Sequence, residues 1–304
     1  MSAPSHDSDP FQHARPRLLG LAYRMLGSRA DAEDILQDAW LRYQGVDPDG
    51  IDNPDAWLTT VVTRLSLDRL KSARVQREVY VGPWLPEPVV DANGMSPESA
   101  TELADDLSFA LLLTLERLTP AERAAFLLHD VFDTPFATVA AALERSEAAC
   151  RQLASRARKA VRQAHPGQQA TDADHLALLQ QFVVAIGSGR TEGLMQLLAT
   201  DAIAYADGGG VRISALNPIR GRTNVARFYM GLARKFITRG TEATMRTIVL
   251  NGRPAVLLFL DGQLDQALNI DVRDGLINRI YSVRNPEKLT HLGMQEITPT
   301  DAAH

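Results

Sequence analysis

One stretch, residues 134–162, constrains the fold of this chain more than any other. Its sequence predicts two short helices with a tight turn at 143–145, the first capped by Thr134 and the second by Ser146. In the second helix apolar residues recur at spacings of three and four, which predicts a buried stripe of Cys150, Leu153, Ala157 and Val161. Because its opposite face is basic, the pattern is typical of a helix-turn-helix that reads duplex DNA. A helical hairpin whose basic face is merely solvated is the alternative.

The composition limits where nucleic acid could bind. The chain has 304 residues, 45% hydrophobic and 23% charged, as expected for a globular protein of two or three domains. Its net charge is -5, so DNA binding must depend on local basic patches. A single cysteine, a polar N-terminus and the lack of an apolar run of about 20 residues favour a cytoplasmic protein without a membrane span.

Residues 11–79 predict a helical domain with two charged faces. The second of its helices exposes an acidic set: Asp31, Glu33, Asp34, Gln37 and Asp38. The third, which begins after Asn53, exposes a basic set: Arg64, Arg69, Lys71, Arg74 and Arg77. These faces are either ordinary solvated surfaces or docking surfaces for two different partners.

The next segments alternate between linkers and helices. Residues 80–97 are rich in Pro and Gly, which predicts a linker, and its large apolar residues Trp84 and Leu85 need something to pack against. A further helical domain is expected over 98–165. It starts with a helix from Ser96 through the acids to 118, and a capping box at 119–122 precedes the helix-turn-helix. Residues 166–172 predict a second linker, and residues 1–10 and 293–304 loose tails.

Residues 173–292 differ from the preceding segments, because their pattern predicts strands as well as helices. Two amphipathic helices precede a strand, a turn at 207–210 and a strand at 211–215 that pairs across that turn. After another helix, four strands are separated by Asn-Gly or Asp-Gly turns at 251–252, 261–262 and 274–275. Helices followed by an antiparallel meander predict an α+β cone.

In order and spacing, residues 11–165 resemble a bacterial RNA polymerase sigma factor of the extracytoplasmic-function (ECF) type. Four segments carry this resemblance: residues 27–43, residues 53–78, residues 115–132 and the helix-turn-helix. Residues 172–292 resemble the SnoaL-like, NTF2-like fold that one subfamily of these sigma factors carries at the C-terminus. The expected fold is therefore multidomain, with two all-α sigma domains, the second with a helix-turn-helix, followed by an α+β NTF2-like cone.

Three short segments mark that subfamily. They are the linker residues Trp84, Leu85 and Pro86, the loop Asp207, Gly208, Gly209 and Gly210, and the tail Asn285, Pro286, Glu287, Lys288 and Leu289. Val211 stands where the subfamily usually has Lys, and Glu287 where it has Asp. We expect the loop and the tail to touch the linker and to regulate the angle between the two DNA-binding domains.

The resemblance also implies partners for the charged faces. The acidic set would dock on core RNA polymerase. Asn53 and the basic set would hold the melted minus-ten strand of promoter DNA. The duplex minus-thirty-five element would be contacted by Arg151, Gln152, Ser155, Arg156, Arg158 and Lys159. Of these, Arg151 is the best candidate for a guanine contact.

Two other functions fit parts of the sequence. A ligand-sensing helix-turn-helix regulator that acts without polymerase would leave residues 11–78 unexplained. An isomerase or hydrolase would use Tyr205, Asp207 and Asp271 in the mouth of the cone. No metal-ligand spacing, Ser/His/Asp set or phosphate loop is present, so we expect no cofactor or metal. The resemblance to the sigma-factor subfamily, rather than any single residue, implies a regulatory role and no catalysis. A small-molecule ligand of this domain stays open.

Overall fold

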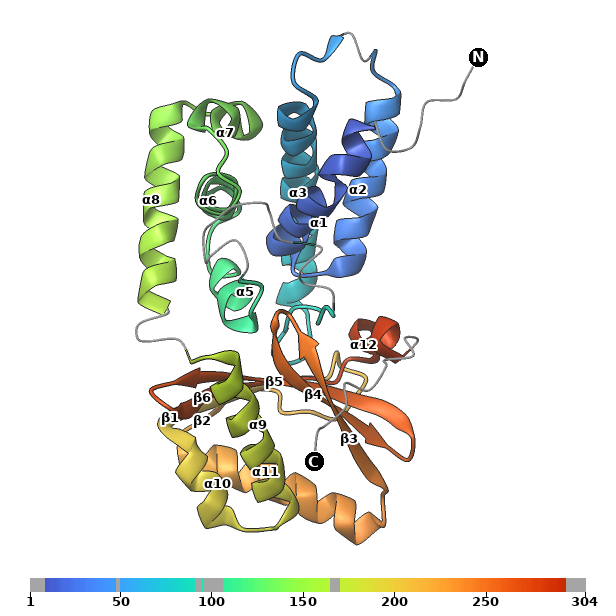
Figure 1. Ribbon diagram of the computed structural model, residues 1–304, viewed down its shortest axis with the longest axis vertical. Helices are drawn as coiled ribbons and strands as arrows, with labels where there is room; N and C mark the ends of the chain where they lie inside the picture. Colours follow the sequence, from blue (N-terminus) through green and yellow to red (C-terminus); the bar gives the residue numbers. More distant parts are fainter. Residues whose placement is uncertain (1–8, 48–49, 91–94, 96–105, 165–169, 294–304) are drawn as a thin grey trace. The chain divides into compact units, whose positions relative to one another are not determined.

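The computed structural model describes residues 9–47, 50–90, 95, 106–164 and 170–293 (Figure 1). It divides into two compact units, one of residues 1–78 and 91–166 and one of residues 79–90 and 167–304. The division does not follow chain order, because residues 79–90 belong to the C-terminal unit. The predicted tails and second linker lie largely outside the described residues, as does the predicted helical segment at 96–105.

Three helices pack together in the first half of unit 1. They are α1 (Pro10–Leu26), α2 (Arg29–Gln44) and α3 (Pro54–Glu78). Gly27 ends α1 in the left-handed conformation, and the hydroxyl of Ser28 caps α2 by accepting from the Asp31 amide. Fully buried leucines of α1 meet apolar residues of α2 and α3, as the sequence predicts.

The second half of unit 1 contains the helix-turn-helix. Its elements are α5 (Phe109–Leu115), α6 (Pro120–Phe126), the π-helical turn η4 (Leu127–Val131), α7 (Phe136–Leu143) and α8 (Glu147–Ala164). The capping box at Thr119 and the buried stripe on α8 are confirmed. At the turn between α7 and α8, Glu144 is left-handed, and Ser146 caps α8.

Two local predictions in this half are wrong. Thr134 does not cap α7, because the helix starts one residue later with Pro135 at the N-cap position, and the Thr134 hydroxyl donates to the Phe132 carbonyl instead. The helix expected to run to residue 118 is shorter, because Ser108 caps α5 and the helix ends at Leu115.

Unit 2 is built on one six-stranded sheet of order β2-β1-β6-β5-β4-β3. Its strands are β1 (Leu198–Asp207), β2 (Ile219–Arg220), β3 (Ala243–Leu250), β4 (Arg253–Leu260), β5 (Gln263–Arg273) and β6 (Leu276–Val283). Its helices are α9 (Asp172–Gly187), α10 (Thr191–Leu197), α11 (Arg222–Arg239) and α12 (Pro286–Gly293). β1 runs parallel to β6, and the other pairs are antiparallel.

The three predicted hairpin turns are confirmed, with Asn251, Asp261 and Asp274 all at positive φ. The predicted strand at 211–215 is wrong. The amides of Val211 and Arg212 both donate to the Gly208 carbonyl, so the chain makes a local turn, and β1 pairs with β6 and β2 instead.

The apolar core of unit 2 lies between the sheet and its helices. Helices α9, α10 and α11 lie over one face of the curved sheet (Figure 1). Phe182 of α9 and Tyr229 of α11 meet edge to face, with ring centroids 5.2 Å apart, above Val256 and Ile280 of the sheet. By strand alternation, residues next to these core positions point to the opposite face.

Gly20 of α1 tests how closely unit 1 is packed. A Cβ on Gly20 would lie 1.8 Å from the Met95 carbonyl oxygen, so Gly20→Ala should lower the free energy of unfolding by about 2 kcal/mol despite the better helix propensity of Ala. Gly45→Ala is the control, because the nearest atom that its Cβ would meet in the described part of the chain is the Arg42 carbonyl oxygen at 3.6 Å. Denaturant unfolding compares the two, and equal effects would contradict the predicted close approach.

Candidate nucleic-acid interface and linker clasp

The acidic face of α2 is partly occupied by ion pairs. Asp31 accepts from Arg69 of α3, and Glu33 pairs with Arg29 at 3.0 Å. The remaining members of the set are exposed and lie within about one helical turn: Asp34, Gln37 and Asp38. These three side chains form an exposed part of the predicted polymerase surface, in which Asp34 also lies 3.8 Å from the Arg69 guanidinium.

Within unit 1, Arg64 binds the helix-turn-helix. Its guanidinium donates to the carbonyls of Ala141 and Ala142 at the end of α7 and lies 3.2 Å from the Glu144 carboxylate. A cation at a helix C-terminus is favourable, because the carbonyls there carry partial negative charge. One predicted minus-ten contact is thus engaged with the predicted minus-thirty-five reader.

The other residues predicted to contact the minus-ten strand differ in their exposure and in their partners within the protein. Lys71 is exposed and pairs with Asp68. The Asn53 side chain accepts from the Ala56 amide, so it caps α3. Arg77 is largely withdrawn from solvent, because its guanidinium pairs with the partly buried Glu116 and donates to the Leu26 carbonyl. The structure does not describe the side chain of Arg74.

The DNA-facing side of α8 also contains both free and paired side chains. Gln152, Ser155 and Lys159 are exposed. Arg151 is exposed near the start of α8, where it pairs with Glu147 at 3.0 Å and lies over the Phe136 ring. Arg156 is exposed and pairs with Glu122, whereas the half-buried Arg158 ties α8 to Asp130 of η4.

In unit 2 a buried carboxylate binds the linker to the rest of the domain. Asp207, at the end of β1, is 0% exposed. Its Oδ1 accepts from the Tyr80 hydroxyl at 2.6 Å, and its Oδ2 accepts from the Leu85 amide at 2.9 Å and from Lys288 Nζ at 2.7 Å. Asn285 Nδ2 donates to the Tyr80 hydroxyl at 3.0 Å. We call Tyr80, Leu85, Asp207, Asn285 and Lys288 the linker clasp.

Aromatic rings of the linker surround the cation of the clasp. Lys288 Nζ lies 4.4 Å from the centroid of the Trp84 ring and 5.1 Å from that of Tyr80, and it donates to the Leu85 carbonyl. Burial and the adjacent Asp207 carboxylate raise the pKa of Tyr80, so its hydroxyl stays protonated and can donate.

Two further contacts extend the docked segment. The Val89 amide donates to Asn251 Oδ1 at 3.1 Å. In return, the Asn251 amide donates to the Val89 carbonyl at 2.7 Å. His291 of α12 lies 2.7 Å from the Pro88 carbonyl and 3.3 Å from Glu87. Sequence reasoning missed Tyr80, Asn251 and His291, since nothing local marks them as linker contacts.

The glycines of the 207–210 loop permit this close docking. Gly209 has φ +64°, and a Cβ there would lie 2.5 Å from the Asn285 side chain. Gly210 has φ +74° and faces Val81 of the linker. Both positions therefore need the freedom of glycine. The loop, the tail and the linker contact one another, and their regulatory role stays a prediction.

The residues suggested for catalysis do not line a common mouth. Asp207 belongs to the clasp, and Asp271 pairs with Arg279 at 3.4 Å. Tyr205 stacks on Tyr281, on the sheet face opposite to the core beneath α9 and α11. The predicted catalytic mouth is therefore wrong. Ala204 and Ile270 face the core, and because side chains alternate along a strand, their neighbours Tyr205 and Asp271 face the other way.

Comparison with known proteins identifies the family. Residues 11–75 match the model of Sigma-70 region 2, and residues 108–161 match that of Sigma-70, region 4. The chain is 42% identical over 296 residues to the ECF RNA polymerase sigma factor SigJ of Mycobacterium tuberculosis, covering 94% of each. It is 30% identical to the probable ECF sigma factor SigI of that organism, covering 94% of this chain and 97% of SigI.

A solved structure agrees with this relationship. The crystal structure of SigJ has a TM-score of 0.71 and 38% identity, covering 92% of this chain and 97% of that one. The chain belongs to the ECF RNA polymerase sigma factors. It combines sigma regions 2 and 4 with a SnoaL-like C-terminal extension, so the predicted fold class is confirmed. Regions 2 and 4 imply binding of core RNA polymerase and promoter DNA. In the described part of the chain, no helix is long and apolar enough to cross a bilayer.

The clasp can be tested by amide exchange. Lys288→Met leaves the buried Asp207 carboxylate without its cation, which should cost about 3 kcal/mol and speed hydrogen exchange of the Leu85 amide on the order of 100-fold. The matched control is Lys235→Met, an exposed lysine of the same unit, which should leave this rate unchanged. Unaltered exchange in Lys288→Met would show that the ion pair does not hold the linker.

Proposed function

We propose that the SnoaL-like domain regulates this sigma factor in cis by holding residues 79–90. The observation that carries the proposal is the buried Asp207–Lys288 pair, which closes on the linker backbone through Leu85. A buried ion pair is stable only with its full set of partners, so the clasp favours one docked arrangement over loose association.

The docked segment shortens the covalent connection between α3 and α5. Region 2 ends with α3 and region 4 begins near α5, so residues held by the clasp no longer contribute to the reach of that connection. A shorter connection raises the effective concentration of one region at the other. In this proposal the clasp therefore favours the contact between Arg64 and the end of α7, which withholds Arg64 from promoter DNA.

Release of that contact would free Arg64 of α3 and the end of α7 from each other. We assign polymerase docking to the exposed acids of α2, contact with the melted minus-ten strand to Arg64 and Lys71, and minus-thirty-five readout to Arg151 and Gln152. The exposure of these side chains or their position at the α3–α7 contact supports the assignment. Such a protein would act in the cytoplasm, where core polymerase is found.

Run-off transcription with core polymerase tests the regulatory role. Lys288→Met should raise transcription by about twofold, since effective concentration falls only as about the −3/2 power of linker length. The exposed-lysine control Lys235→Met should transcribe as the parent does. If Lys288→Met releases the linker in hydrogen exchange but leaves transcription unchanged or lower, the proposed regulation is wrong.

The roles proposed for α8 can be separated by binding with holoenzyme. Arg151→Ala should weaken binding about 5- to 100-fold for the preferred minus-thirty-five element and less for an element changed at the contacted base, because a base contact carries sequence choice. Lys159→Ala should weaken binding to both elements about equally. It should also reduce the slope of log binding constant against log salt concentration by about 1, because one phosphate contact is lost. A uniform loss for Arg151→Ala would assign Arg151 to phosphate.

A further inference from the structure

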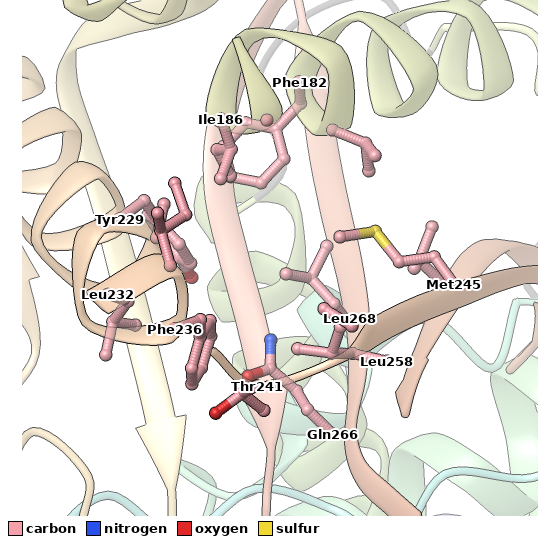
Figure 2. A pocket seen from close by; sticks show the side chains of 16 residues that line it. Phe182, Ile186, Tyr229, Leu232, Phe236, Thr241, Met245, Leu258, Gln266 and Leu268 are labelled. Atoms are coloured by element: carbon pink, nitrogen blue, oxygen red, sulfur yellow. The ribbon is translucent and has the colours of Figure 1, made fainter. Parts of the chain in front are cut away.

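The C-terminal unit contains an apolar cavity away from the clasp. It lies between α9, α11 and strands β3, β4 and β5, and its volume is about 220 Å³ (Figure 2). Phe182 and Ile186 project into it from α9, Tyr229, Leu232 and Phe236 from α11, and Met245, Leu258 and Leu268 from the sheet. We propose that this cavity binds a small, uncharged, mostly apolar molecule with a single hydrogen-bonding group.

The volume sets the size of the ligand. A cavity of about 150 Å³ is large enough for benzene, so this one should hold a molecule of about nine or ten heavy atoms. An empty apolar cavity leaves its lining without contacts on one side, and a ligand of this size would restore those contacts.

The lining excludes a charged ligand. None of the described side chains that line the cavity is an acid, a base or a histidine. A carboxylate or ammonium group would be buried there without a counter-charge, which is strongly unfavourable. Without an acid, a base or a histidine in the described lining, the cavity offers none of these groups for proton transfer, so it is suited to binding a ligand rather than to catalysis.

Two polar side chains mark one end of the cavity. Gln266 and Thr241 both line the cavity and are drawn at its lower side in Figure 2. Gln266 is 7% exposed, and its Nε2 donates to Ser282 Oγ at 3.2 Å, which in turn lies 3.0 Å from the Tyr229 hydroxyl. In the described part of the chain, no residue donates to Gln266 Oε1. Because the Nε2 bond to Ser282 holds the Gln266 amide in place, its Oε1 is available to accept from a ligand hydroxyl or N–H.

The rim of the cavity is accessible. Ile237 of α11 and Met245 of β3 both line it, and they are 74% and 45% exposed. Apolar residues at a rim let a hydrophobic molecule enter without crossing charged groups. The cavity therefore combines an apolar entrance, an uncharged wall and one polar end.

Calorimetry on the full chain tests the site with two probes of similar size. We expect 4-ethylphenol, which is neutral with one hydroxyl, to bind with one-to-one stoichiometry and a Kd below about 1 mM. The anion 4-methylbenzoate should bind at least tenfold more weakly. The absence of saturable 4-ethylphenol binding, or equal affinity for the anion, would overturn the proposal. Because binding is measured directly, the result does not depend on the proposed regulation.

Variants then locate the bound probe. Ala233→Phe places a ring in the cavity and should abolish binding, whereas Arg234→Phe places the same ring on an exposed position of α11 and should not. Gln266→Leu should weaken 4-ethylphenol about fivefold and leave ethylbenzene unchanged, because only the phenol loses a hydrogen bond. Circular dichroism checks that each variant folds. Unchanged phenol binding in folded Ala233→Phe, or equal losses of both probes in Gln266→Leu, would contradict the assigned site.

Discussion

The Asp207–Lys288 ion pair is the interaction on which the organisation of the C-terminal unit depends. Charges this deeply buried are tolerated only when every partner is present. The end of β1, the start of α12 and the linker are therefore fixed by one shared requirement. The Asp207 carboxylate accepts from Tyr80, Leu85, Gly209 and Lys288, so loss of any one segment would leave a buried charge with too few donors.

Much of this architecture could be predicted from local sequence. Helix ends followed from caps such as Ser28 and Thr119, and hairpins from Asn-Gly and Asp-Gly pairs. The linker, loop and tail were singled out by the resemblance to one sigma-factor subfamily, which implied that they meet. The partners Tyr80 and His291 could not be predicted, because they meet segments far away in the chain and no local spacing encodes such a contact.

Charge patterns were less informative about individual side chains. The sequence shows that α3 and α8 are basic, but it does not show which guanidinium has an internal partner. Arg77 and Arg158 have such partners in Glu116 and Asp130. The same limit explains Tyr205 and Asp271, since a one-residue step along a strand reverses the face of the sheet that a side chain meets. The Thr134 prediction was wrong for a different reason, because α7 starts one residue later than expected and the Thr134 hydroxyl bonds back to Phe132.

The residues of the linker clasp lie far apart in the sequence, so the ribosome makes them at different times. Leu85 and Lys288 are 203 residues apart. At about 5–20 residues per second, the ribosome adds the lysine roughly 10–40 s after the leucine. Sigma regions 2 and 4 are complete well before that moment. Each new molecule therefore has both of its promoter-binding regions for a short time before the segment that completes the linker clasp exists.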